Sequence, residues 1–160
     1  MVQNSNQILM FIMSSYQSVS SASAFWSACL DRPGVLAPTS ITSPACSGNL
    51  CTVVRGETLN SDVYFVFPAA YSRLDVRISV ILYGVEVYIP LEDPYDNACN
   101  FMYRGGAFVG CPTVAGQEHL WRIGMQIPLD YPAFANEVVR YELFDGDSLA
   151  ACADLQTTVL

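Results

Sequence analysis

Six cysteines are the residues of this chain with the most definite chemistry. They all lie beyond residue 28, at Cys29, Cys46, Cys51, Cys99, Cys111 and Cys152. Cysteine thiols either bind a metal, usually at short fixed spacings, or pair as disulfides. The chain has no Cys-x-x-Cys and only one histidine. The even count therefore indicates a disulfide framework, in which the sequence alone does not determine which cysteines pair. It also predicts a compartment outside the cytosol.

Few other side chains could do chemistry. His119 is the only histidine, and a lone histidine in this setting predicts a surface or edge-strand residue rather than a catalytic base. The acidic residues Glu92, Asp93, Asp145 and Asp147 flank turns, where such side chains bond to the nearby backbone. The sequence contains no GxSxG, P-loop, GxGxxG or metal-ligand spacing. We therefore expect no enzyme activity and no metal or cofactor.

Composition sets limits on the partners. The chain has 160 residues, of which 52% are apolar and 14% are charged, so it can bury one sizeable core. Its net charge of −8 disfavours nucleic acid, which needs a basic face. The same charge disfavours electrostatic binding to anionic membranes or phosphorylated glycolipids. An apolar, neutral or weakly charged ligand is compatible with this balance.

The first residues differ from the rest of the chain. A short apolar run at 8–13 precedes a Ser/Ala-rich tract, and Ala22-Ser23-Ala24 resembles a signal-peptidase site. We interpret residues 1–24 as a secretory signal and residues 25–160 as the folded domain. A disordered N-terminal tail is the alternative, since no Lys or Arg precedes the apolar run.

The remainder has the period-two alternation of β-strands with one buried face. The alternating segments are 62–67, 75–82, 85–89, 121–127, 139–144 and 149–159. Strands with turns at these intervals predict an all-β fold, an antiparallel two-sheet sandwich, with a closed barrel as the alternative. The inward positions carry almost no charge. They are Val63, Phe65, Val76, Ile78, Val80, Leu82, Val85, Val87, Ile89, Ile123, Met125, Ile127, Val139, Tyr141 and Leu143. The stretch 100–111 is expected to be a long surface loop.

Short sequence words surround the cysteines in a fixed order. They are Gly34-Val35, Pro44-x-Cys46-x4-Cys51, Arg55-Gly56, Tyr83-Gly84-Val85-Glu86-Val87 with Pro90, Asp93-Pro94, Cys111-Pro112, Val114-x-Gly116-Gln117 and Phe144-x-Gly146-Asp147. In this order the chain from about Ala28 to Leu160 resembles the ML (lipid-recognition) family. That family includes the soluble Niemann–Pick type C (type 2) sterol carriers and the group 2 mite allergens.

The resemblance implies three disulfides, Cys29–Cys152, Cys46–Cys51 and Cys99–Cys111. The first would close a loop of more than 100 residues, which the chain-entropy model values at about 4–5 kcal/mol. The third pair encloses a longer segment than is usual in the family, with Phe101, Met102, Tyr103 and Phe108. We expect these side chains to add an aromatic lip near a ligand cavity.

The resemblance also implies an immunoglobulin-like sandwich whose sheets separate to leave an internal apolar cavity. The ligand would be a sterol, a fatty acid or a similar lipid. Ile89 stands where sterol carriers of the family have an aromatic residue, so ring stacking at that position is lost. The expected lipid contacts are Val63, Phe65, Val80, Val87, Ile89, Ile123, Met125, Leu129, Tyr131 and Tyr141.

The functional hypothesis is a secreted, monomeric lipid-binding and transfer protein that delivers its lipid to a receptor or membrane protein. No Asn-x-Ser/Thr acceptor occurs, so extracellular fluid is expected, with the lysosomal lumen as the alternative. One alternative function is an innate-immune glycolipid sensor of the same fold, although the chain has no Lys to meet phosphates. Another is an immunoglobulin-like adhesion module, although the usual Cys…Trp…Cys spacing is absent.

Overall fold

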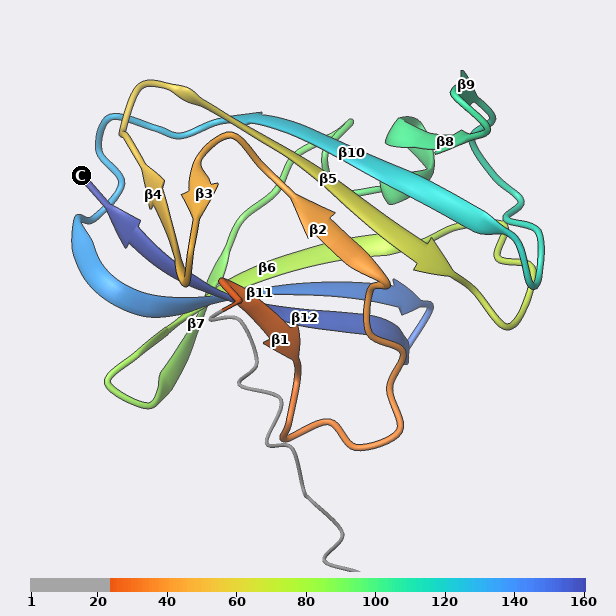
Figure 1. The fold of residues 1–160 in the computed structure, drawn as a ribbon, viewed down its shortest axis with the longest axis horizontal. Helices are drawn as coiled ribbons and strands as arrows, with labels where there is room; N and C mark the ends of the chain where they lie inside the picture. The colour runs from red at the N-terminus through yellow and green to blue at the C-terminus, as the bar shows by residue number, and fades with distance from the viewer. Residues whose placement is uncertain (1–23) are drawn as a thin grey trace, which may run out of the picture.

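The computed structural model describes residues 24–160, so the secretory signal expected at 1–24 lies outside the described residues except for Ala24. The regular secondary structure of the described chain is almost entirely β-strand, arranged as two facing sheets (Figure 1). Its elements are β1 Trp26–Ala28, β2 Ser40–Thr42, β3 Cys46–Ser47, β4 Leu50–Val53, β5 Thr58–Val66, β6 Asp75–Leu82, β7 Val85–Ile89, the 3₁₀ turn η1 Ala98–Phe101, β8 Met102–Arg104, β9 Ala107–Phe108, β10 Glu118–Gln126, β11 Phe134–Asp145 and β12 Ser148–Val159.

The larger sheet has the order β3-β4-β12-β11-β6-β7, with β1 also paired to β12. The smaller sheet has the order β2-β5-β10-β8-β9. The two-sheet immunoglobulin-like sandwich predicted from the alternation is confirmed. One pairing departs from the antiparallel expectation, because β4 runs parallel to the end of β12.

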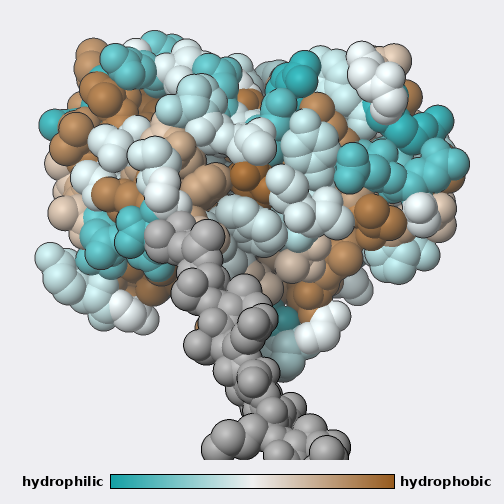
Figure 2. All heavy atoms as spheres, in the orientation of Figure 1, coloured by the Kyte–Doolittle hydropathy of each residue, from teal (hydrophilic) through white to brown (hydrophobic). Residues whose placement is uncertain are grey.

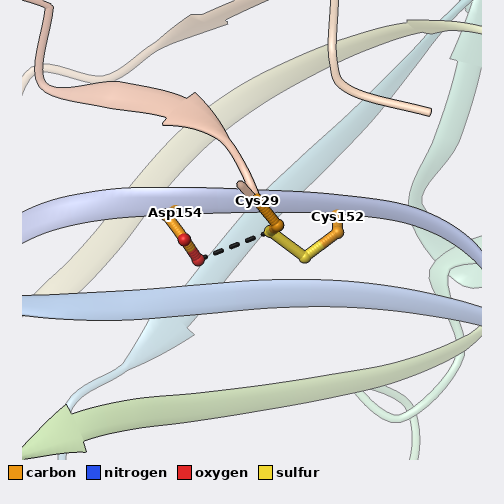
Figure 3. Close-up of side chains that lie close together, drawn as sticks. All are labelled: Cys29, Cys152 and Asp154. Carbon is orange, nitrogen blue, oxygen red and sulfur yellow. Dashed lines mark hydrogen bonds between the residues drawn. A yellow bond between two sulfur atoms is a disulfide. The ribbon is translucent and has the colours of Figure 1, made fainter. Parts of the chain in front are cut away.

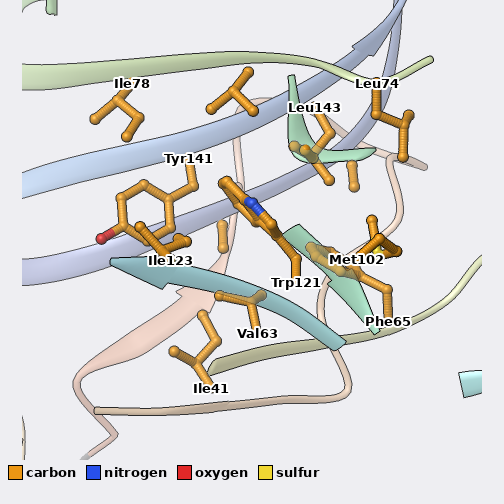
Figure 4. Packing of buried hydrophobic residues seen from close by; sticks show 14 of the residues in the cluster. Ile41, Val63, Phe65, Leu74, Ile78, Met102, Trp121, Ile123, Tyr141 and Leu143 are labelled. Carbon is orange, nitrogen blue, oxygen red and sulfur yellow. The ribbon is translucent and has the colours of Figure 1, made fainter. Parts of the chain in front are cut away.

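Large side chains fill one half of the space between the sheets (Figure 4). Phe65 and Trp121 point inward from the smaller sheet, and Leu143 points inward from the larger one. The Trp121 ring meets the Tyr141 ring edge-on, with centroids 5.9 Å apart, so this contact joins the two sheets. This half of the sandwich is packed solid.

The hairpin of β6 and β7 contains two residues that were predicted to face inward but are exposed. Tyr83 and Gly84 both have positive φ, as the two-residue turn between these strands requires. Val85 is 63% exposed and Val87 is 48% exposed. Their prediction as buried residues is wrong because β7 is the edge strand of the larger sheet and extends beyond the cover of the smaller one (Figure 1).

The stretch 100–111, expected to be a long surface loop, instead contains regular structure. It begins in η1 and forms the β8–β9 hairpin, which lies at the edge of the smaller sheet. Met102 is fully buried in the core, and Tyr103 meets Phe108 edge-on at 5.7 Å. The segment is a structural edge of the sandwich.

Three disulfides join Cys29 to Cys152, Cys46 to Cys51, and Cys99 to Cys111. They are the pairs that the family resemblance implied. The first holds the segment after β1 against β12 of the larger sheet. No helix within residues 24–160 has both the length and the apolar character that crossing a membrane would require.

Candidate ligand cavity

The other half of the sandwich is hollow. A cavity of about 300 Å³ lies between the sheets at the end where β4, the 126–134 connection and the C-terminus meet (Figure 1). Its walls come from nearly every long strand. They include Leu59 and Ser61 of β5, Met125 of β10, Val139 and Tyr141 of β11, and Leu155, Thr157 and Val159 of β12, together with Cys46, Cys51, Val53, Ile78 and Phe134.

The cavity opens between two connections. Its exposed lining residues are Pro90, Glu92 and Tyr95 after β7, and Gln126 and Pro128 at the end of β10. On the face shown in Figure 2, apolar side chains lie among polar ones at this end of the molecule, and others lie at the opposite end. The mouth thus combines Pro90, Tyr95 and Pro128 with the polar side chains of Glu92 and Gln126, and an apolar interior behind a few polar groups is the usual form of a site for a small hydrophobic ligand.

The rim of the opening is held by the Arg55-Gly56 turn. Gly56 has a φ of +85°, and a Cβ there would stand 2.8 Å from Leu129. The amide of Gly56 donates to the Ile127 carbonyl at 2.7 Å. Arg55 donates from its guanidinium to the carbonyls of Tyr131 and Leu160. These contacts explain why a glycine is needed at position 56 and why the 127–131 connection has a defined position.

The walls are electrically neutral. Among the lining residues, all of which lie within the described part of the chain, Glu92 at the mouth is the only one with a charged side chain. Burial raises the pKa of Tyr131 to about 12, and burial also raises the pKa of Tyr141 to about 12. Both phenols therefore stay protonated at physiological pH. An ionised ligand group would find no cation among the lining residues.

The ten expected contact residues separate into three groups. Ile89, Met125, Tyr131 and Tyr141 line the cavity. Val63, Phe65, Val80 and Ile123 are buried between the sheets but do not line it. Val87 and Leu129 are exposed, and Leu129 lies at the rim beside Pro128 with 76% of its surface accessible.

The aromatic lip expected from residues 101–108 is wrong, since none of these side chains lines the cavity. Phe101 contacts the cavity mouth only through another residue, because its ring stacks on Tyr95 at 5.5 Å and Tyr95 lines the mouth.

Sequence reasoning missed three residues that line the cavity, which are Ser61, Thr157 and Val159. Ser61 could have been found, because it occupies an inward position in the alternation of β5 where its neighbours are apolar.

The comparisons with known proteins agree with this geometry. The family model described as ML domain matches residues 23–159. The chain belongs to the ML domain family. Its curated relatives include two mite group 2 allergens, Der p 2 of Dermatophagoides pteronyssinus and Eur m 2 of Euroglyphus maynei. Each is 29% identical over 111 residues, which cover 69% of this chain and 70% of the relative.

Two solved structures share the fold of this ML domain. A Niemann–Pick type C2 protein from the Japanese carpenter ant aligns with a TM-score of 0.70 at 17% identity, covering 84% of this chain and 98% of that one. Chicken MD-1, solved in complex with lipid IVa, aligns with a TM-score of 0.51 at 15% identity, covering 82% and 85%. At these identities the likeness concerns the fold alone.

His119 of the ML domain corrects a further expectation. It is fully buried rather than at the surface. Its Nε2 accepts from the amide of Val114 at 3.2 Å, and its Nδ1 lies 2.9 Å from the carbonyl of Gln117. A neutral imidazole with its proton on Nδ1 satisfies both contacts. Both ring nitrogens are therefore used in holding the turn that leads into β10.

The outer face of the larger sheet is also buried in part, against the segment after β1. Arg140 is only 3% exposed and forms paired hydrogen bonds with Asp154 at 2.7 and 2.9 Å. It forms a second pair with Asp31 at 2.7 and 3.0 Å. This contact holds the pKa of Asp31 below its ordinary value. The sequence pattern had assigned this face to solvent.

Asp154 also lies beside the Cys29–Cys152 disulfide (Figure 3). These three residues are close enough to suggest a metal site. However, both cysteines are oxidised, so they have no thiolates to offer. The disulfide sulfur has no proton to donate either, so its 3.4 Å approach to the Asp154 carboxylate is a packing contact.

Proposed function

We propose that this ML domain is a secreted carrier that binds one lipid between its two sheets and transfers it without chemical change. The ligand is a sterol, a fatty acid or a similar apolar molecule. The observation that supports this proposal is the neutral, apolar cavity of about 300 Å³ with an exposed mouth. The three disulfides support an extracellular location.

The size of the cavity supports reversible binding. An engineered cavity of about 150 Å³ lined by Leu, Ile and Phe accepts benzene, and this one is about twice as large. Burying about 300 Å² of ligand surface contributes about 7 kcal/mol before ordering costs. Before those costs, this contribution corresponds to a dissociation constant on the order of 10 μM without a charged anchor.

The walls disfavour a phosphorylated glycolipid. Glu92 is the only charged lining residue and it is acidic. A phosphate at the mouth would meet like charge at Glu92, and the Arg55 guanidinium at the rim already donates to the carbonyls of Tyr131 and Leu160. The structure therefore favours the carrier over the glycolipid sensor.

Native mass spectrometry of the protein from a eukaryotic secretory host tests the carrier proposal. We expect one bound lipid per chain, and after delipidation we expect uptake of cholesterol or stearate in titration. Recovery of protein without lipid, together with no uptake of either compound, would overturn the proposal.

A pair of surface variants tests the position of the entrance. Leu129→Asp places a carboxylate at the rim, whereas Leu30→Asp makes the same change at a site 89% exposed in the segment after β1. We expect slower lipid uptake, by a factor of several, for Leu129→Asp alone, with similar thermal stability for both. Equal uptake rates would mean that lipid enters elsewhere.

A further inference from the structure

One inward residue of β5 does not fit an apolar cavity. The inward series is Leu59, Ser61, Val63 and Phe65, and only Ser61 carries a polar group. Ser61 is 3% exposed and lines the cavity. Its Oγ has no hydrogen-bond partner among the described residues. Leaving a buried hydroxyl without a partner costs about 1–3 kcal/mol, so this position calls for an explanation.

A second hydroxyl faces the same space from the opposite sheet. Tyr141 of β11 is 4% exposed and lines the cavity. In Figure 4 its ring lies between Ile78 and Ile123, and its hydroxyl points away from Trp121. Burial raises the pKa of Tyr141, and the nearby Ser61 side chain opposes that increase. The two residues face the same cavity from opposite sheets, and Ser61 Oγ has no hydrogen bond to the Tyr141 hydroxyl.

This pair lies at the inner end of the cavity. Tyr141 packs against Trp121, which belongs to the solid half of the core and does not line the cavity. Glu92 and Gln126, in contrast, are exposed and lie at the mouth. The Thr157 hydroxyl also lines the cavity, but it already donates to the carbonyl of Leu155 at 3.3 Å. The cavity thus has a polar mouth, an apolar middle and a small polar site at its floor.

We infer that Ser61 and Tyr141 form a specificity site that binds one neutral hydroxyl or carbonyl group at the buried end of an otherwise apolar ligand. This inference rests on the proposed carrier function. A ligand hydroxyl can donate to one of the two oxygens and accept from the other. An ionised carboxylate is excluded from the floor, because no cation lines it and burying an unpaired charge is costly. The favoured class is a neutral lipid, such as a long-chain alcohol or ketone, whose oxygen enters first.

Displacement of a fluorescent naphthylamine by two matched compounds tests this inference. Decanol and chlorodecane have the same chain length, but only decanol carries a hydroxyl. A hydrogen bond worth about 1 kcal/mol corresponds to about a fivefold change in affinity. We expect Ser61→Ala to weaken decanol about fivefold and to leave chlorodecane unchanged. Tyr141→Phe should give the same selective loss.

Two controls separate recognition from structure. Thr157→Val removes a lining hydroxyl that already has a protein partner, so it should leave the ratio of the two affinities unchanged. Ser61→Ala should not lower the unfolding midpoint of the ligand-free protein, because it removes a buried hydroxyl without a partner. A clear loss of that midpoint would assign Ser61 a structural role and overturn the inference.

The outcomes for the two proposals are distinct. If the wild-type protein binds neither decanol nor chlorodecane, and also takes up no cholesterol or stearate, the carrier function fails and the floor site fails with it. If it binds both compounds but Ser61→Ala leaves their affinity ratio unchanged, the ligand hydroxyl lies at the mouth. In that case the floor site is wrong and the carrier function stands.

Discussion

The two faces of strand β11 are both buried, but they bury different chemistry. Val139 and Tyr141 point toward the cavity, whereas Arg140 and Glu142 alternate with them on the outer face. On the inner face about 300 Å³ stays unfilled. On the outer face one guanidinium makes four hydrogen bonds of 3.0 Å or less to two carboxylates.

This difference follows from how each kind of group can be buried. A charge leaves water only if it is paired in nearly ideal geometry, so the outer face has one permitted arrangement. Apolar contacts have no direction, and an apolar surface tolerates changes of volume. The outer face can therefore fix the segment after β1 in place, while the inner face can admit a guest.

The largest expected effect is on the outer face. Arg140→Met would remove the hydrogen-bond partner of Asp154. Because only 16% of the Asp154 side chain is accessible, water could not fully replace that partner. Breaking a buried ion pair from one side costs about 3–5 kcal/mol. We expect a loss of that size in the free energy of unfolding, measured by urea denaturation with the disulfides intact. Uptake of lipid by the folded fraction should be unchanged.

Arg122→Met is the matched control. Arg122 also forms paired hydrogen bonds, with Asp62 at 3.0 and 3.3 Å, but its side chain is 54% exposed. Exposed ion pairs contribute little to stability, so Arg122→Met should destabilise the protein far less than Arg140→Met. Equal losses in the two variants would mean that the outer face of β11 is no more constrained than an ordinary surface.

The next effect compares the hollow half of the sandwich with the solid half. Val139 lines the cavity, while Val76 is 6% exposed in the packed cluster and pairs with Leu143. Val76→Phe should cost about 1–3 kcal/mol by overpacking. Val139→Phe has room for the ring, so its free energy of unfolding should change by less than about 1 kcal/mol.

The two Val→Phe variants should differ in the opposite sense in ligand binding. Filling the cavity removes space that the guest needs, so Val139→Phe should weaken stearate uptake on the order of tenfold, whereas Val76→Phe should leave it unchanged. The dye-displacement assay measures both. If Val139→Phe destabilises the protein as much as Val76→Phe does, the hollow half is not open space in solution.

Much of the sandwich could be predicted from the sequence, because alternation shows which residues share a face. Each of the six alternating segments forms a strand in the structure. The short motifs around the cysteines indicated the family. Burial of the outer face could not be predicted. Arg140 and Glu142 look like solvent-facing residues until the segment after β1 is placed over them, and that placement depends on contacts with Asp31 more than one hundred residues away.

The candidate site was predicted only in part, and for a related reason. Alternation identifies which side chains point inward but not where the two sheets separate. Phe65 and Met125 are both inward by pattern, yet Phe65 lies in the solid half and Met125 lines the cavity. Tyr103 and Phe108 were misplaced because their hairpin pairs with β10 at the edge of the smaller sheet, and neither residue lines the cavity.

The smallest effect concerns Glu142, a buried member of the outer face whose charge is poorly compensated. Its Oε1 has no hydrogen-bond partner among the described residues, and Arg32 comes no nearer than 4.0 Å to its Oε2. Burial raises the pKa of Glu142 above its ordinary value, and the negative charge of Glu86 raises it further. Arg32, Arg140 and Arg77 only partly oppose this shift.

The sign of the pH dependence follows from that shift. A carboxyl whose pKa is higher in the folded state favours folding when protonated, so its contribution is complete below the ordinary value of 4.5 and is lost as the pH rises through the folded-state pKa. Glu142→Gln removes this loss. Wild type and variant should therefore have similar unfolding midpoints at acid pH, and the variant should be the more stable at neutral pH.

Asp31, whose pKa Arg140 lowers, contributes to the pH dependence of stability with the opposite sign. Its contribution is the same in both proteins and cancels in the comparison. Thermal unfolding between pH 4 and pH 7 measures the difference. If the difference in unfolding midpoint between wild type and variant became smaller as the pH rises, Arg32 would fully compensate the Glu142 charge. Both faces of β11 would then be free of electrostatic strain.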